Sequence, residues 1–188
     1  MGYAVPTAPQ GDGSEPRECI TQAQMQAFAE MTYQRPAMKE MVNRGVDPDD
    51  EFDGYVLALQ FKNAVPYDRI MRQFAGNPCY VEFKHQARDQ WAFVLPCVNC
   101  PTSYRVQYFD KHGMIRHRSE NSMELAVETM VIEGFVVLDK GAADRLSQGI
   151  DWLRGTEIAG LVSQRNSGQL TEAEFNEQRR AVDAKYAH

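Results

Sequence analysis

The sequence predicts an α+β fold, with a small antiparallel sheet of four to five strands between a helical N-terminal segment and a C-terminal helical hairpin. Three observations lead to this class. The two ends of the chain show the apolar spacing of amphipathic helices, and the middle has short runs rich in aromatic and β-branched residues, several with period-two alternation. Gly and Pro separate these stretches.

We divide the chain into four segments. Residues 1–18 are rich in Pro, Gly and small polar residues, so we expect a flexible or partner-bound arm without a core of its own. Residues 19–45 are predicted to be a helical segment, and residues 46–140 an α+β core. Residues 141–188 are predicted to be a helical C-terminal region that contains the hairpin.

The helical segment has clear boundary signals. Thr21 and Gln24 have the spacing of a capping box, in which each side chain satisfies the other residue's backbone N–H. Pro36 breaks this helix and suits the first position of another, Pro36–Arg44, which Gly45 ends. The segment is rich in methionine, which lines contact surfaces and fills ordinary cores equally well.

The middle of the chain is predicted to contain most of the strands. The expected strands are Tyr55–Phe61, Cys79–Phe83, Trp91–Leu95, Ser103–Phe109 and Phe135–Leu138. Helical spacing predicts a short helix at Tyr67–Phe74 and another at Met123–Met130, with Ser122 as its N-cap. Residues 111–118 are predicted to be a basic loop.

The most complete local pattern is a helix, turn and helix between Ile158 and Val182. Gly168 suits the left-handed conformation of a helix C-cap, and Thr171 with Glu174 forms a second capping box. Leu170 and Phe175 have the spacing of a hydrophobic staple over that cap.

This stretch resembles the SHOCT family of short C-terminal helical hairpins. The resemblance is carried by Leu161, Gly168, Leu170, Thr171, Glu172, Glu174 and Phe175. It covers about the last sixth of the chain, and Ala181 and Val182 stand where the family usually has two larger aliphatic residues. The resemblance implies an oligomerisation or helper module without chemistry of its own, in which Leu161, Leu170 and Phe175 are the expected interaction residues.

Cys97-Val98-Asn99-Cys100 is the sharpest motif in the middle of the chain. Two thiolates on a tight turn between strands can face one tetrahedral zinc ion, and His112 and His117 are the expected further ligands. Cys79 and His85 are substitutes. The competing interpretation is that these cysteines are reduced and act as small apolar residues.

A basic group of three residues suggests an alternative partner. Lys111, Arg116 and Arg118 follow an aromatic strand, and such a combination can stack bases and hold phosphates. The formal net charge of −6 argues against a broad nucleic-acid footprint, so nucleic acid is the less expected partner.

The leading hypothesis is a non-enzymatic interaction or assembly protein, which binds a protein partner or a second copy of itself through the N-terminal arm and the C-terminal hairpin. The chain has no long apolar run and no secretory signal, so we expect no membrane association and a cytoplasmic location. No cofactor is expected unless the motif at Cys97 binds zinc. The alternatives are a zinc-stabilised nucleic-acid-binding regulator and a small enzyme that uses Cys79 or Cys97.

Overall fold

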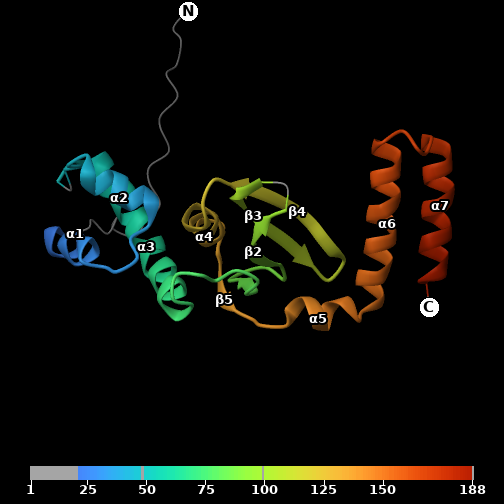
Figure 1. Ribbon diagram of the computed structural model, residues 1–188, viewed down its shortest axis with the longest axis horizontal. Helices are drawn as coiled ribbons and strands as arrows, with labels where there is room; N and C mark the ends of the chain where they lie inside the picture. The colour runs from blue at the N-terminus through green and yellow to red at the C-terminus, as the bar shows by residue number, and fades with distance from the viewer. Residues whose placement is uncertain (1–20, 48, 99, 188) are drawn as a thin grey trace, which may run out of the picture.

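The computed structural model describes residues 21–47, 49–98 and 100–187, and it confirms the α+β class. Figure 1 shows three parts side by side: the helices α1 to α3, a five-stranded sheet covered by α4, and the helical hairpin α6–α7. The elements are α1 (Gln22–Ala29), α2 (Pro36–Asn43), α3 (Glu51–Gln73), β1 (Phe83–His85), β2 (Trp91–Cys97), β3 (Cys100–Asp110), β4 (Gly113–Glu120), α4 (Met123–Ile132), β5 (Phe135–Leu138), α5 (Ala142–Ser147), α6 (Ile150–Asn166) and α7 (Glu172–Lys185).

The sheet has the strand order β4-β3-β2-β1-β5, and all neighbouring strands are antiparallel. Neighbouring residues of a strand point to opposite faces, so each face has its own core. Val94 and Val106 lie in the main core together with residues of α4. Trp91 and Phe109 point to the other face, where they form a smaller cluster with Ala142 of α5.

The helix boundaries in the N-terminal segment follow the predicted signals. The Thr21 hydroxyl accepts a hydrogen bond from the Gln24 backbone N–H at 3.3 Å, and the Gln24 side chain accepts one from the Thr21 N–H at 2.8 Å. Pro36 is the first residue of α2, and Gly45 follows the helix with a φ of +66°. The left-handed backbone at residue 45 therefore favours glycine.

The N-terminal helices have a core separate from that of the sheet. Phe28, Met38, Leu57 and Ala64 are fully buried together, and three further methionines pack against them: Met25, Met31 and Met41. The methionine-rich segment is therefore core. Because Leu57 and Ala64 belong to α3, the N-terminal helical unit continues beyond the boundary predicted at residue 45.

The predicted strand Tyr55–Phe61 is wrong, because this stretch is part of α3. The predicted short helix Tyr67–Phe74 is the end of the same helix. Three buried residues with a spacing of seven mark its inner face: Leu57, Ala64 and Met71. This helical period extends over two-thirds of α3, whereas the period-two pattern that suggested a strand covers only seven residues. Pro66 lies inside the helix and does not end it.

Two further predictions in the sheet need correction. The predicted strand Cys79–Phe83 contributes only Phe83 to β1, and Cys79 makes an isolated bridge to Val94. The predicted basic loop 111–118 is mostly strand, because β4 begins at Gly113. All side chains of β4 between Met114 and Ser119 are exposed. The sequence of β4 therefore lacks the alternation of apolar and polar residues from which a strand is predicted.

A buried ion pair joins the N-terminal helices to the sheet domain. Arg35, which precedes α2, has no exposed surface, and its Nε donates to the Glu128 carboxylate of α4 at 2.9 Å. Its Nη1 donates to the Gln60 carbonyl of α3 at 2.8 Å. Glu128 also accepts a hydrogen bond from the Ala37 N–H at 3.3 Å, so it caps the start of α2 from another helix.

We predict that Glu128→Gln strongly destabilises the protein, because it leaves the Arg35 charge buried without a countercharge. Breaking a buried pair in this way typically costs about 3–5 kcal/mol in the free energy of unfolding. Urea denaturation will measure this change.

The matched control is Glu40→Gln, which breaks the exposed pair between Glu40 and Arg44, whose side chains are 62% and 71% exposed. Exposed pairs contribute about 0–1 kcal/mol. Equal, small effects of the two substitutions would contradict the structural role of the buried pair.

Candidate functional site

The C-terminal hairpin stands on the turn between β3 and β4. Lys111 in this turn forms an ion pair with Asp151 of α6 at 3.1 Å, and the ring of Trp152 packs edge-on against Phe109 at 5.9 Å. The backbone of α6 comes so close at Gly155 that a Cβ atom there would lie 1.7 Å from the His112 carbonyl oxygen. A residue without a side chain is therefore required at this contact.

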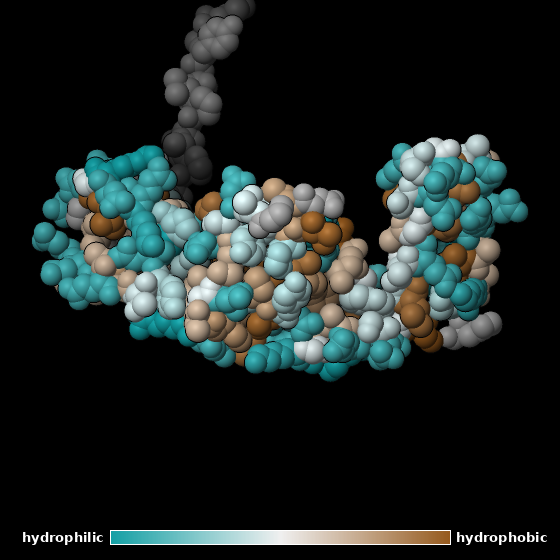
Figure 2. All heavy atoms as spheres, viewed as in Figure 1, coloured by the Kyte–Doolittle hydropathy of each residue, from teal (hydrophilic) through white to brown (hydrophobic). Residues whose placement is uncertain are grey.

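The rest of the hairpin stands clear of the sheet domain. Figure 1 shows α6 leading away from the β3–β4 turn, with α7 on its far side. The space-filling view in Figure 2 shows a wide open notch between the sheet domain and the upper part of the hairpin. The C-terminal hairpin thus projects from the sheet domain and is fixed at its base.

The hairpin itself forms as predicted. Gly168 has a φ of +74°, and the Gln169 N–H donates to the Gln164 carbonyl at 2.9 Å, which completes a Schellman C-cap. The Thr171 hydroxyl accepts from the Glu174 backbone N–H at 3.3 Å, and the Glu174 carboxylate accepts from the Thr171 N–H at 2.8 Å. Both helix ends at the turn are therefore satisfied locally.

Two of the three predicted interaction residues are buried in the hairpin. Leu161 and Phe175 are only 9% and 4% exposed, and the Arg165 guanidinium covers the Phe175 ring at 4.5 Å. Leu170 is half-buried at the turn. Leu161 and Phe175 are therefore not available to a partner, and the interaction role predicted for these two side chains needs correction.

Polar pairs close the opposite end of the hairpin. Arg154 donates to Asp183 at 2.9 and 2.6 Å, and Glu157 accepts from Lys185 and from the Tyr186 hydroxyl at 2.5 and 2.6 Å. The hydrogen bond from Lys185 is the largest cause of the lowered pKa of Glu157. The two helices are thus joined by polar contacts near the base and, closer to the turn, by Arg165 of α6 over the Phe175 ring of α7.

We predict opposite effects for two glycine substitutions in α6. Gly155→Ala inserts a methyl group into the contact with His112, so α6 should shift away from the β3–β4 turn and the protein should lose about 1–3 kcal/mol of stability. Gly160→Ala meets open space, so it should stabilise the helix by up to about 1 kcal/mol.

Thermal unfolding and tryptophan fluorescence will measure these effects, because Trp152 reports on the base of α6. A red shift is expected for Gly155→Ala only. The same response of both variants would contradict close docking at Gly155.

The structure separates the two histidines of the predicted zinc site from its two cysteines. Cys97 and Cys100 face each other at the tip of the β2–β3 hairpin, as predicted. His112 lies beyond the other end of β3, and His117 pairs with Gln107, so at about 3.3 Å per residue both histidines are more than roughly 20 Å from Cys100. No group of three or more His, Cys, Asp or Glu residues suited to a metal lies among the described residues.

The substitute ligands are not at this tip either. The Cys79 sulfur lies 3.9 Å from the Met123 sulfur, and the His85 ring packs edge-on against Phe135 at 5.1 Å. Burial raises the pKa of Cys79, which lowers its thiolate fraction at neutral pH. This environment disfavours Cys79 as the nucleophile of an enzyme.

Cys100 has a different environment. Its thiol is exposed and accepts a hydrogen bond from the Ser103 hydroxyl at 3.2 Å, and the Thr102 hydroxyl lies at 3.5 Å. Hydrogen bonding from Ser103 first, and then from Thr102, lowers the pKa of Cys100. Cys100 is therefore the more reactive of these two thiols.

We predict that iodoacetamide modifies Cys100 faster than Cys79 near pH 7. The thiolate is the reactive form, so the rate ratio should fall as the pH rises toward values at which both thiols ionise. Timed alkylation of the metal-free protein, followed by peptide mass spectrometry, will measure both rates. Ser103→Ala should slow Cys100 alone, and equal rates for the two cysteines near pH 7 would contradict this account.

The three predicted nucleic-acid-binding residues are each paired with an acidic residue. Lys111 pairs with Asp151, and Arg118 pairs with Glu120 at 2.7 Å. Arg116 pairs with Glu133, and its guanidinium stacks 3.8 Å from the ring centroid of buried Tyr108. Arg116 and Arg118 point to the α4 side of the sheet, whereas Lys111 contacts α6. The structure therefore does not gather the three into one basic patch.

One candidate residue, Arg105, was not predicted from the sequence. It lies in β3 between the β2–β3 tip and Phe109, on the face of the sheet opposite α4. Arg105 has Leu95 and Ser119 as its cross-strand neighbours and shares their face. Its Nε is fully buried and has no hydrogen-bond partner within the described part of the chain. A buried donor of this kind without an acceptor lowers the stability of the free chain. Residues 105, 107 and 109 alternate along β3 with the core residues Val106 and Tyr108, and this alternation is the sequence signal for the face opposite α4.

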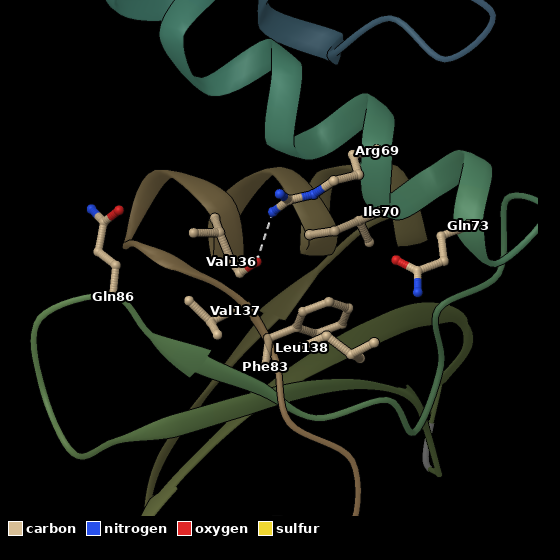
Figure 3. A pocket seen from close by; sticks show the side chains of 8 residues that line it. All are labelled: Arg69, Ile70, Gln73, Phe83, Gln86, Val136, Val137 and Leu138. Carbon is tan, nitrogen blue, oxygen red and sulfur yellow. Dashed lines mark hydrogen bonds between the residues drawn. The ribbon is translucent and has the colours of Figure 1, made fainter.

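A groove of about 410 Å³ lies where α3 passes the outer strand β5. Figure 3 shows Ile70, Phe83 and Val137 around it, with Arg69 reaching across to β5. Arg69 donates to the Val136 carbonyl at 2.9 Å, so its side chain blocks part of the free strand edge. Charged side chains commonly protect sheet edges in this way, and we assign the groove a structural role.

The comparisons with known proteins give no match. No family model, curated protein or solved structure matches this chain. Among the described residues, no helix combines the length and apolar character needed to cross a membrane.

Proposed function

We propose that this chain is a non-enzymatic assembly protein that presents its C-terminal helical hairpin to a protein partner in the cytoplasm. The observation that carries the proposal is the fixed but projecting hairpin. An isolated hairpin of this length is marginally stable in water, and docking at Gly155 stabilises it while leaving most of its surface accessible.

Exposed apolar residues near the base of α6 support this role. Ile150 and Leu153 are 54% and 45% exposed. They lie next to the docked end of α6, where the orientation of the helix is fixed most firmly. A partner that packs on this end would bury them, and exposed apolar groups of this kind often mark interaction surfaces.

Arg105, whose Nε has no hydrogen-bond partner among the described residues, gives a second argument for a protein partner. A partner that extends from the hairpin base toward the sheet could accept a hydrogen bond from the guanidinium through a backbone or carboxylate oxygen. The buried Nε lowers the stability of the free chain, and a partner that pairs with the rest of this half-buried guanidinium would offset that cost.

Site-specific photo-crosslinking in the source cells tests the proposal. A benzophenone amino acid at Leu153 or Glu177 should give a discrete crosslinked product, whereas the same group at exposed Ala87 in the β1–β2 loop should not. Capture alone is not sufficient. The captured protein must also bind the purified full-length chain.

The decisive variants are Leu153→Asp and Leu59→Asp. The two leucines have equal exposure, 45%, but Leu59 lies on α3, away from the hairpin. We expect Leu153→Asp to weaken binding of the captured partner at least about tenfold, as is typical of a well-packed apolar contact, and Leu59→Asp to leave it unchanged. Equal effects, or crosslinking from Ala87 alone, would refute the hairpin as the presenting element.

A further inference from the structure

The tip of the β2–β3 hairpin combines features that the proposed role of the C-terminal hairpin does not use. Cys97 and Cys100 are direct register partners there. Side chains of opposed residues in an antiparallel pair project to one side, with Cβ atoms about 4.5–5.5 Å apart. Two thiolates on one tetrahedral zinc ion are about 3.8 Å apart, given Zn–S bonds of about 2.3 Å, so small rotations of the two side chains would suffice to bind the ion.

The surroundings of Cys100 favour a thiolate. The Ser103 hydroxyl, 3.2 Å away, donates to the sulfur, and the Thr102 hydroxyl lies 3.5 Å from it. A hydroxyl donor such as that of Ser103 orients the sulfur of a metal-binding cysteine. Pro96 and Pro101 flank the motif in the sequence and restrict the backbone on both sides.

The described part of one chain supplies only these two ligands. No third His, Cys, Asp or Glu of the described residues joins them in a group that could hold a metal. A structural zinc site has four protein ligands. The missing two must therefore come from another molecule or from outside the described residues.

The exposure of the tip indicates another molecule. Val98, between the two cysteines, is 88% exposed, more than any other large apolar side chain of the described residues. A second copy of the same tip, related by a twofold axis, would supply two more thiolates and cover this side chain. Twofold contacts of identical surfaces are the commonest form of self-association.

We propose that Cys97 and Cys100 are one half of an interchain zinc site, in which the β2–β3 tips of two copies bind one Zn²⁺ through four cysteine thiolates. The tip lies at the opposite end of β3 from the turn that holds α6. A dimer joined at the tips therefore leaves both C-terminal hairpins accessible. The inference does not depend on the proposed function of those hairpins.

Zinc binding by the purified full-length chain, with a phosphine reductant present, tests the inference. Elemental analysis after desalting should give half a zinc ion per chain, and light scattering should show a dimer that a chelator returns to a monomer. Replacement of zinc by Co²⁺ should give the absorption spectrum of a tetrahedral tetrathiolate site.

Variants distinguish this site from other uses of the thiols. Cys97→Ser and Cys100→Ser should each abolish both zinc binding and the dimer, whereas Cys79→Ser and Cys19→Ser should retain both. Circular dichroism should show the two tip variants folded, because Cys97 and Cys100 lie outside the buried core, and the same measurement checks the two controls. One zinc ion per monomer, no retained zinc, or a dimer that survives in Cys100→Ser would each overturn the proposal.

Discussion

The buried ion pair between Arg35 and Glu128 is the constraint on which the arrangement of the molecule depends. Glu128 lies on α4, whose apolar side covers the sheet, and its carboxylate reaches back to the N-terminal helices. One side chain thus neutralises a buried guanidinium and caps α2. Such a pair contributes little net stability compared with apolar residues of the same size, but its loss is costly, so it favours one arrangement of the two cores over others.

Hydrogen bonds to two carboxylates also fix the path of the chain on the C-terminal side of the sheet domain. Glu82, which precedes β1, accepts hydrogen bonds from the backbone N–H groups of Ala142 and Ala143 at 3.0 Å each, and so caps α5. Asp139 accepts from the Trp91 indole at 2.8 Å, and this hydrogen bond lowers the pKa of Asp139. These contacts fix the direction in which α5 leaves the sheet. Docking at Gly155 then fixes α6, so the hairpin has a defined direction.

Local signals in the sequence predicted much of this structure. Thr21, Thr171 and Gly168 mark helix ends through residues no more than five positions away, and a pattern of this range is complete within the sequence itself. The same holds for the pairing of Cys97 with Cys100 across a short turn. The strand predicted at residues 55–61 failed because a short apolar run fits both periods, and only the longer pattern in α3 decides between them.

The candidate sites were less predictable because they depend on distant contacts. Arg35 and Glu128 are 93 positions apart, and His112 and Gly155 meet only because α6 returns to the sheet. The predicted zinc ligands and basic residues were grouped by closeness in the sequence. An extended strand such as β3 separates residues by about 3.3 Å per position, so this grouping placed the histidines near thiols that lie at its other end.

The C-terminal hairpin projects from the sheet domain in one fixed orientation. Double electron–electron resonance can test this orientation through the distance between two spin labels. The labels are non-natural amino acids at exposed Gln164 of α6 and exposed Lys62 of α3 in the metal-free protein. The structure predicts one narrow distance distribution at the separation of these two positions. A broad distribution, or a much shorter distance from a hairpin folded back onto the sheet, would contradict it.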